Sequence, residues 1–222
     1  MNPLLNKSRA LPLRYLKRVY HVGTLQASDK GCRGTSLEGR GLSVSINPDA
    51  WTKIAKLGGL PCWQLDSQKG CFLDFHKLSK ERLDEIAAWG VDHDLTIERD
   101  GWSVSWLDDE LGHACEMLFT DRESAETEAD GWREINPKRL LASTEKLAQR
   151  AGYKPDPAQT LDFLAISFAE DVLAVDGVWW KDELDPVRLS APRGVIFPAR
   201  LQHWTPTRLP ETAVVNSGRR RA

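Results

Sequence analysis

Two short segments near the N-terminus have the hydrophobic pattern of β-strands. Residues 19–25 are β-branched and aromatic, and residues 42–46 alternate apolar side chains with serine at period two. A loop with four glycines joins them over residues 26–41. Glycines of this kind suit tight turns and a close approach of the backbone to a ligand.

A helix is predicted directly after the second strand. Asn47 is a preferred N-cap residue, Pro48 fits the first helical position, and Asp49 suits the positive end of the helix dipole. Apolar residues follow at helical spacing until Gly58 and Gly59 end the helix.

The rest of the chain mixes both patterns, so it predicts an α+β protein. The further predicted elements are a hairpin over 61–75 with its turn at 66–70, a helix over 81–90 opened by Ser79, a ββα unit over 98–131 whose helix is capped by Asp121, helices over 137–151 and 158–170, strands over 175–180 and 194–197, and a polar tail after Pro206.

Composition predicts a globular protein of one domain, or one domain with an insertion. The chain has 222 residues, of which 41% are hydrophobic and 28% charged. It has no run of 18 apolar residues and no leader of the secretory type, so we expect a cytoplasmic protein that contacts no membrane. Its four cysteines form no CxxC pair, and Cys62, Cys71 and His76 lack the short paired spacing of a zinc site. No metal is predicted.

Charge is balanced over the whole chain and uneven along it. The 30 basic and 32 acidic residues give no general attraction to nucleic acid. Residues 81–130, however, hold 16 acids and three arginines, whereas both ends of the chain are basic. The acidic stretch is either a solvated face, a mimic of nucleic acid, or a surface that docks a basic partner.

Three motifs together resemble the ADP-ribosyltransferase superfamily, whose members split NAD and transfer ADP-ribose. They are YHVGT at 20–24, GLSVS at 41–45 followed by the predicted helix, and DGV at 176–178 before GVIFP at 194–198. The resemblance implies an ADP-ribosyltransferase-like split β-sheet core.

This core would consist of residues 17–80 and 158–206. Residues 81–157 would form an inserted acidic module with helices and the ββα unit. A basic extension over 1–16 and a flexible tail over 207–222 would flank the core.

The resemblance also assigns roles to residues of the first two motifs. His21 matches the histidine that binds a ribose hydroxyl of NAD, Gly23 the position whose backbone meets the nicotinamide amide, and Thr24 offers a second polar contact. Ser43 and Ser45 match the serine–x–serine element of the arginine–serine–glutamate branch. The alternative for His21 is a structural histidine.

A stacking residue and a catalytic acid have no matching position. The candidates for stacking on nicotinamide are Tyr20, Trp51, Trp179 and Trp180, and core or edge packing is the alternative for the tryptophans. Arg193 stands about where the family has its catalytic glutamate. Glu183 is the nearest candidate for that acid and Glu38 the next, and a solvated loop acid is the alternative for both.

Two functions are therefore expected. The first is a NAD-dependent ADP-ribosyltransferase that acts on a protein or nucleic-acid target, as a bacterial or mobile-element effector or toxin, with NAD as co-substrate. The alternative is a non-catalytic binding protein on the same scaffold that docks a partner through its acidic module. A phosphotransferase acting on RNA would need a basic cleft, for which Arg33, Arg40, Arg193 and Arg200 are the candidates.

Overall fold

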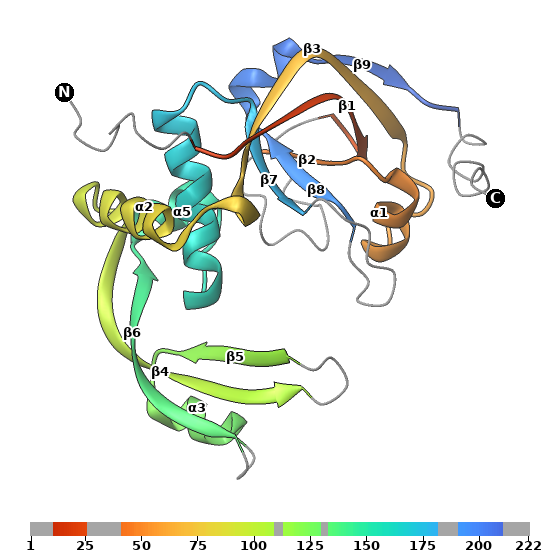
Figure 1. Cartoon of the computed structure of the whole chain (residues 1–222). Helices are drawn as coiled ribbons and strands as arrows, with labels where there is room; N and C mark the ends of the chain where they lie inside the picture. The colour runs from red at the N-terminus through yellow and green to blue at the C-terminus, as the bar shows by residue number, and fades with distance from the viewer. Residues whose placement is uncertain (1–10, 26–40, 109–112, 130–132, 182–190, 211–222) are drawn as a thin grey trace. The chain divides into compact units, whose positions relative to one another are not determined.

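The computed structural model shows a mixed α+β protein in two compact units (Figure 1). Unit 1 comprises residues 1–82 and 165–222, and unit 2 comprises residues 83–164. The residues that the structure describes are 11–25, 41–108, 113–129, 133–181 and 191–210. The bounds of unit 2 are close to those predicted for the inserted module, residues 81–157.

Unit 1 is built on a sheet of six strands. They are β1 (Leu13–Val22), β2 (Leu42–Ser45), β3 (Cys62–Asp74), β7 (Gly177–Lys181), β8 (Arg193–Ile196) and β9 (Thr205–Arg208). Their order is β1-β2-β8-β7-β3-β9, and β1 also pairs with β3. Five strands therefore close into a barrel-like sheet, while β9 extends it beside β3. Buried Val19, Val44, Phe72 and Trp179 belong to one cluster in its core.

The predicted N-terminal helix is confirmed as α1 (Pro48–Ile54). The Asn47 side chain accepts a hydrogen bond of 3.1 Å from the backbone N–H of Ala50. Trp51 packs with Val22 and Cys62 in a second core cluster. The cap and the buried tryptophan together hold α1 on unit 1.

Replacing Asn47 with alanine should lower the free energy of unfolding of unit 1 by about 1 kcal/mol, because an N–H at the helix start loses its acceptor. Denaturant unfolding measures this loss. The control is Lys53→Ala, an exposed position of the same helix, which should change the stability by less than about 0.5 kcal/mol. Equal losses in both variants would contradict the capping role.

The predicted hairpin over 61–75 is wrong. Residues 62–74 form one strand that pairs with β1 from Leu13 opposite Leu73 to Val22 opposite Cys62. A side chain at Gly70 would overlap the Trp204 ring and lie 2.5 Å from the Leu16 carbonyl oxygen. Gly70 therefore permits close packing inside a strand rather than a turn.

Two predicted borders of the core also shift. β1 begins at Leu13, inside the predicted extension over 1–16, because Leu13 to Leu16 pair with β3. β9 ends at Arg208, inside the predicted tail over 207–222. Backbone pairing with β3 holds both of these segments as strands.

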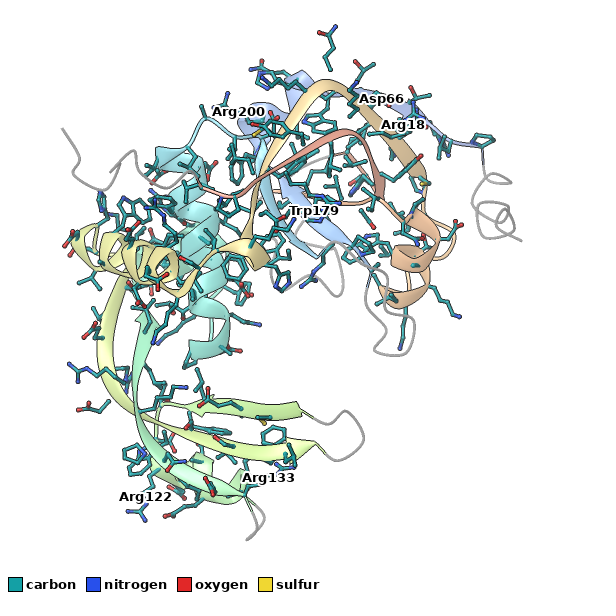
Figure 2. All side chains as sticks on the ribbon, viewed as in Figure 1. Arg18, Asp66, Arg122, Arg133, Trp179 and Arg200 are labelled. Atoms are coloured by element: carbon teal, nitrogen blue, oxygen red, sulfur yellow. The ribbon has the colours of Figure 1, made fainter. Side chains whose placement is uncertain are left out.

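Unit 2 contains a separate three-stranded sheet in the order β5-β4-β6. Its strands are β4 (Thr96–Asp108), β5 (His113–Phe119) and β6 (Glu134–Ser143), and α3 (Arg122–Glu128) packs on it through buried Ala125. Asp121 caps α3 by accepting from Ser124 N–H at 2.8 Å, which confirms the predicted ββα unit. Arg122 lies over the ring of Trp102 and Arg133 over that of Trp106. Both arginines are labelled in Figure 2.

The predicted helix over 137–151 is half wrong. Residues 134–143 are β6, which pairs with β4 from Thr96 opposite Ser143 to Ser105 opposite Glu134. The helix α4 (Glu145–Ala151) starts only after its cap Thr144. A short apolar run such as residues 140–142 fits either a strand or a helix, and pairing with β4 decides between them.

Two further α-helices and two short 3-10 helices complete the described part of the chain. They are α2 (Lys80–Asp92), α5 (Pro157–Val172), η1 (Phe75–Lys77) and η2 (Pro198–His203). Within the described part of the chain, none of the helices is long and apolar enough to cross a membrane.

Candidate functional site

The strands that carry the three motifs are neighbours in unit 1. Tyr20 of β1 lies opposite Ser45 of β2, and Ser43 of β2 lies opposite Val195 of β8. β8 in turn pairs with β7. The fold thus places the motif strands side by side in the order β1-β2-β8-β7.

His21 is enclosed by the backbone of its own unit. The residue is 2% exposed, its Nδ1 lies 2.7 Å from the carbonyl oxygen of Ser43, and its Nε2 lies 2.6 Å from that of Thr24. Both ring nitrogens therefore face protein carbonyls, although a neutral imidazole has only one N–H to donate. A ribose hydroxyl would have to displace one of these carbonyls to reach the ring.

Gly23 also uses both of its backbone polar groups within the protein. Its N–H donates to the carbonyl oxygen of Pro61 at 2.8 Å, and its carbonyl accepts from Trp63 Nε1 at 3.0 Å. Its backbone φ of +134° is an angle that residues other than glycine rarely adopt. The backbone atoms that the resemblance assigns to the nicotinamide amide hold this turn together.

The two serines of the second motif are buried. Ser45 donates from Oγ to the carbonyl of Pro192, and the same oxygen accepts from Asn47 N–H at 3.0 Å. Because side chains alternate along a strand, Ser43 and Ser45 point to the face of β2 opposite Val44. Both are therefore part of the packed sheet, at 7% and 0% exposure.

The structure does not bring Trp179 to these serines. Trp179 shares the core cluster with Val44, on the other face of β2, and is completely buried. Thr24 is exposed beside His21. Glu183 and Glu38 lie outside the described residues. Taken together, the described residues at the predicted NAD positions do not fit the group, because the polar atoms of His21, Gly23 and Ser45 are already paired inside the chain and Trp179 is buried in the core.

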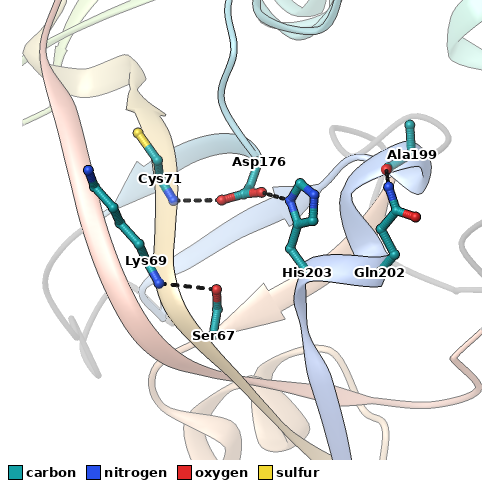
Figure 3. Close-up of polar contacts among 7 residues, drawn as sticks. All are labelled: Ser67, Lys69, Cys71, Asp176, Ala199, Gln202 and His203. Carbon is teal, nitrogen blue, oxygen red and sulfur yellow. Dashed lines mark hydrogen bonds and ion pairs between the residues drawn. The ribbon is translucent and has the colours of Figure 1, made fainter.

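A different polar cluster lies where β3, the start of β7 and η2 meet (Figure 3). One oxygen of Asp176, Oδ2, accepts from the backbone N–H of Cys71 at 2.8 Å, and the other, Oδ1, lies 3.0 Å from His203 Nδ1. The backbone of Asp176 also bonds to Cys71 and Phe197. Asp176 is thus fixed on two sides, and it orients the half-exposed ring of His203.

This Asp176–His203 pair borders a hollow of about 540 Å³. Such a volume lies within the range of about 300–1,000 Å³ typical of small-molecule sites. The side chains around it include Leu13 and Tyr15 of β1, Lys69 and Cys71 of β3, and Arg200 and His203 of η2. A second hollow of about 620 Å³ shares Lys69 and His203 with the first.

The hollow holds no activated nucleophile among its described residues. Burial raises the pKa of the Cys71 thiol above its ordinary value, although the hydrogen bond with Tyr15 acts in the opposite direction. The interaction with Cys71 raises the pKa of the Tyr15 phenol. At neutral pH both groups keep their protons, so the arrangement suits binding rather than covalent chemistry.

The sequence pattern missed this hollow for a definite reason. Asp176 belongs to the DGV motif, but its partner His203 lies 27 residues later in a stretch with no motif. Pairing of β3 with β7 brings the elements together. Among the described residues, no three His, Cys, Asp or Glu side chains gather as a metal site would require.

Comparisons with protein-family models, curated proteins and solved structures found no match to this chain. The site must therefore be interpreted from its own geometry.

Proposed function

We propose that this chain is a non-catalytic binding protein on the scaffold that the resemblance implies. One observation carries the proposal: the polar groups of His21, Gly23 and Ser45 are paired with other parts of the protein. Leaving a buried polar group unpaired costs about 1–3 kcal/mol. NAD bound at these positions would have to offset several such losses.

The net charge of unit 2 indicates which kind of partner it would bind. Unit 2 has 19 acidic and 8 basic residues, a net charge of −11, while unit 1 has 22 basic and 13 acidic residues. Exposed Asp92, Asp94, Glu123 and Glu134 have no ion pair among the described residues. A basic surface on the partner would complement this unit.

Titration with an oligolysine peptide, followed by nuclear magnetic resonance, checks the docking surface on the full chain. We expect shifts concentrated at the acids of unit 2 that diminish as salt rises. Shifts spread evenly over both units, or shifts insensitive to salt, would contradict a charged docking surface.

Titration with NAD tests the proposal directly. We expect no binding by calorimetry at millimolar NAD and no release of nicotinamide. The His21→Ala variant should lose stability, because two carbonyls lose their contacts with the ring, and should leave the NAD result unchanged. Binding with nicotinamide release that both His21→Ala and Glu183→Gln abolish would overturn the proposal.

That opposite outcome would establish the second candidate, a NAD-dependent ADP-ribosyltransferase acting on a macromolecular target. The observation that favours it is the placement of the three motifs on adjacent strands, β1, β2, β8 and β7. In this function Glu183 would act as the catalytic acid and NAD would be the co-substrate.

A further inference from the structure

We propose that the hollow beside Asp176 and His203 binds a phosphorylated nucleoside. This site is separate from the predicted NAD positions around His21, and the inference does not depend on the proposed function. Four features of the hollow support it: unpaired cations, an oriented histidine, an exposed apolar wall and a suitable volume.

The cations provide the site for a phosphate. Arg200 and Lys69 line the hollow, and neither forms an ion pair with any described residue. The only acid among the described lining residues is Asp176, whose two oxygens already face Cys71 N–H and His203. Guanidinium and ammonium groups form charge-assisted hydrogen bonds to phosphate oxygens.

His203 provides an acceptor for a sugar hydroxyl. A carboxylate only accepts hydrogen bonds, so when the ring is neutral Asp176 favours the tautomer with the proton on Nδ1. Nε2 then carries a lone pair and has no partner among the described residues. A ligand with a phosphate for Arg200 and a hydroxyl for His203 satisfies both groups.

The wall of the hollow suits a flat base. Leu13 and Tyr15 stand two residues apart on β1, so they share one face, and they are 40% and 57% exposed. Lys69 Nζ lies 6.0 Å from the centre of the Tyr15 ring. A base stacked on Tyr15 would therefore leave its phosphate within the reach of a cation.

Calorimetric titration of the full chain with adenosine monophosphate tests the inference. We expect binding that weakens by about tenfold in Arg200→Ala, since one charge-assisted hydrogen bond is worth roughly that factor. Tyr15→Ala should weaken it as well, because the stacking surface is lost. Adenosine and inorganic phosphate, each lacking one half of the ligand, should bind more weakly than the nucleotide.

Arg208→Ala is the matched control, because Arg208 is an exposed arginine of unit 1 on β9 and does not line the hollow. It should leave the affinity unchanged. Circular dichroism verifies folding, and Arg200→Gln replaces Arg200→Ala if the latter does not fold. The inference is overturned if adenosine monophosphate does not bind at millimolar concentration, if both Arg200 variants bind it like the wild type, or if Arg208→Ala weakens it equally.

Discussion

Replacing Gly177 with alanine is expected to prevent unit 1 from folding stably. Gly177 stands at the start of β7, between Phe72 of β3 and Ile196 of β8. An added Cβ would overlap the carbonyl oxygen of Val195. Because this oxygen belongs to the backbone of a neighbouring strand, it cannot move aside without opening the sheet. We expect a loss of more than about 3 kcal/mol.

Denaturant unfolding of the Gly177→Ala variant measures this loss. Gly58→Ala is the control, since a Cβ there would meet no atom within 4 Å. That variant should change the free energy of unfolding by less than about 1 kcal/mol. Similar stabilities for both variants would show that β7 and β8 do not pair in this register.

Replacing Trp179 with alanine is expected to cost about 3–5 kcal/mol, because a large buried ring leaves a cavity that the barrel cannot refill. Trp179 is completely buried, and its ring meets that of Phe72 edge to face with centroids 5.6 Å apart. Arg14 lies over the same ring at 5.2 Å. Thermal or denaturant unfolding shows the loss.

The conservative variant Trp179→Phe separates packing from ligand stacking. The indole N–H of Trp179 is buried without a hydrogen-bond partner among the described residues. Phenylalanine removes this group and keeps part of the ring, so it should cost clearly less than alanine. If Trp179→Ala left stability unchanged and altered only NAD binding, the ring would stack on nicotinamide and its place in the core would be refuted.

Local signals predicted the elements whose stabilising contacts are themselves local. Asn47 caps α1 and Asp121 caps α3, and each acceptor lies three residues from its donor. The α+β class follows from the sum of such signals. The strand β2 could be predicted from apolar residues that alternate with serine, and β8 from the short β-branched segment Val195–Ile196.

Errors arose where a distant segment decides the conformation. Gly70 is indistinguishable from a turn glycine until Trp204 and Leu16 are seen to pack against it. Residues 137–143 also fit the pattern of a helix, but β4 pairs with all seven of them. In both places backbone hydrogen bonds to another strand outweigh the weak local preference, which is for a turn at Gly70 and for a helix at 137–143.

The candidate sites show the same division. The motifs that contain His21 and Ser43 could be located from the sequence, and their strands are neighbours. The partners of the His21 ring, however, are backbone carbonyls. Because every residue has a carbonyl, residue types could not predict these contacts. The pairing of Asp176 with His203 joins a motif residue to one without a motif. Geometry alone reveals it.

The sequence by itself determined the class of the fold, the helix caps, the acidic character of unit 2 and the position of the motifs. These properties depend on residue types and on spacings of a few positions, and both can be read directly from the sequence. Only the tertiary structure decided that β3 is one strand, that Trp179 lies in the core, and that Lys69, Arg200 and His203 line one hollow. Those outcomes depend on contacts between residues far apart in the chain. Such residues meet because β1 pairs with β3, which closes the barrel-like sheet, and because β3 pairs with β7.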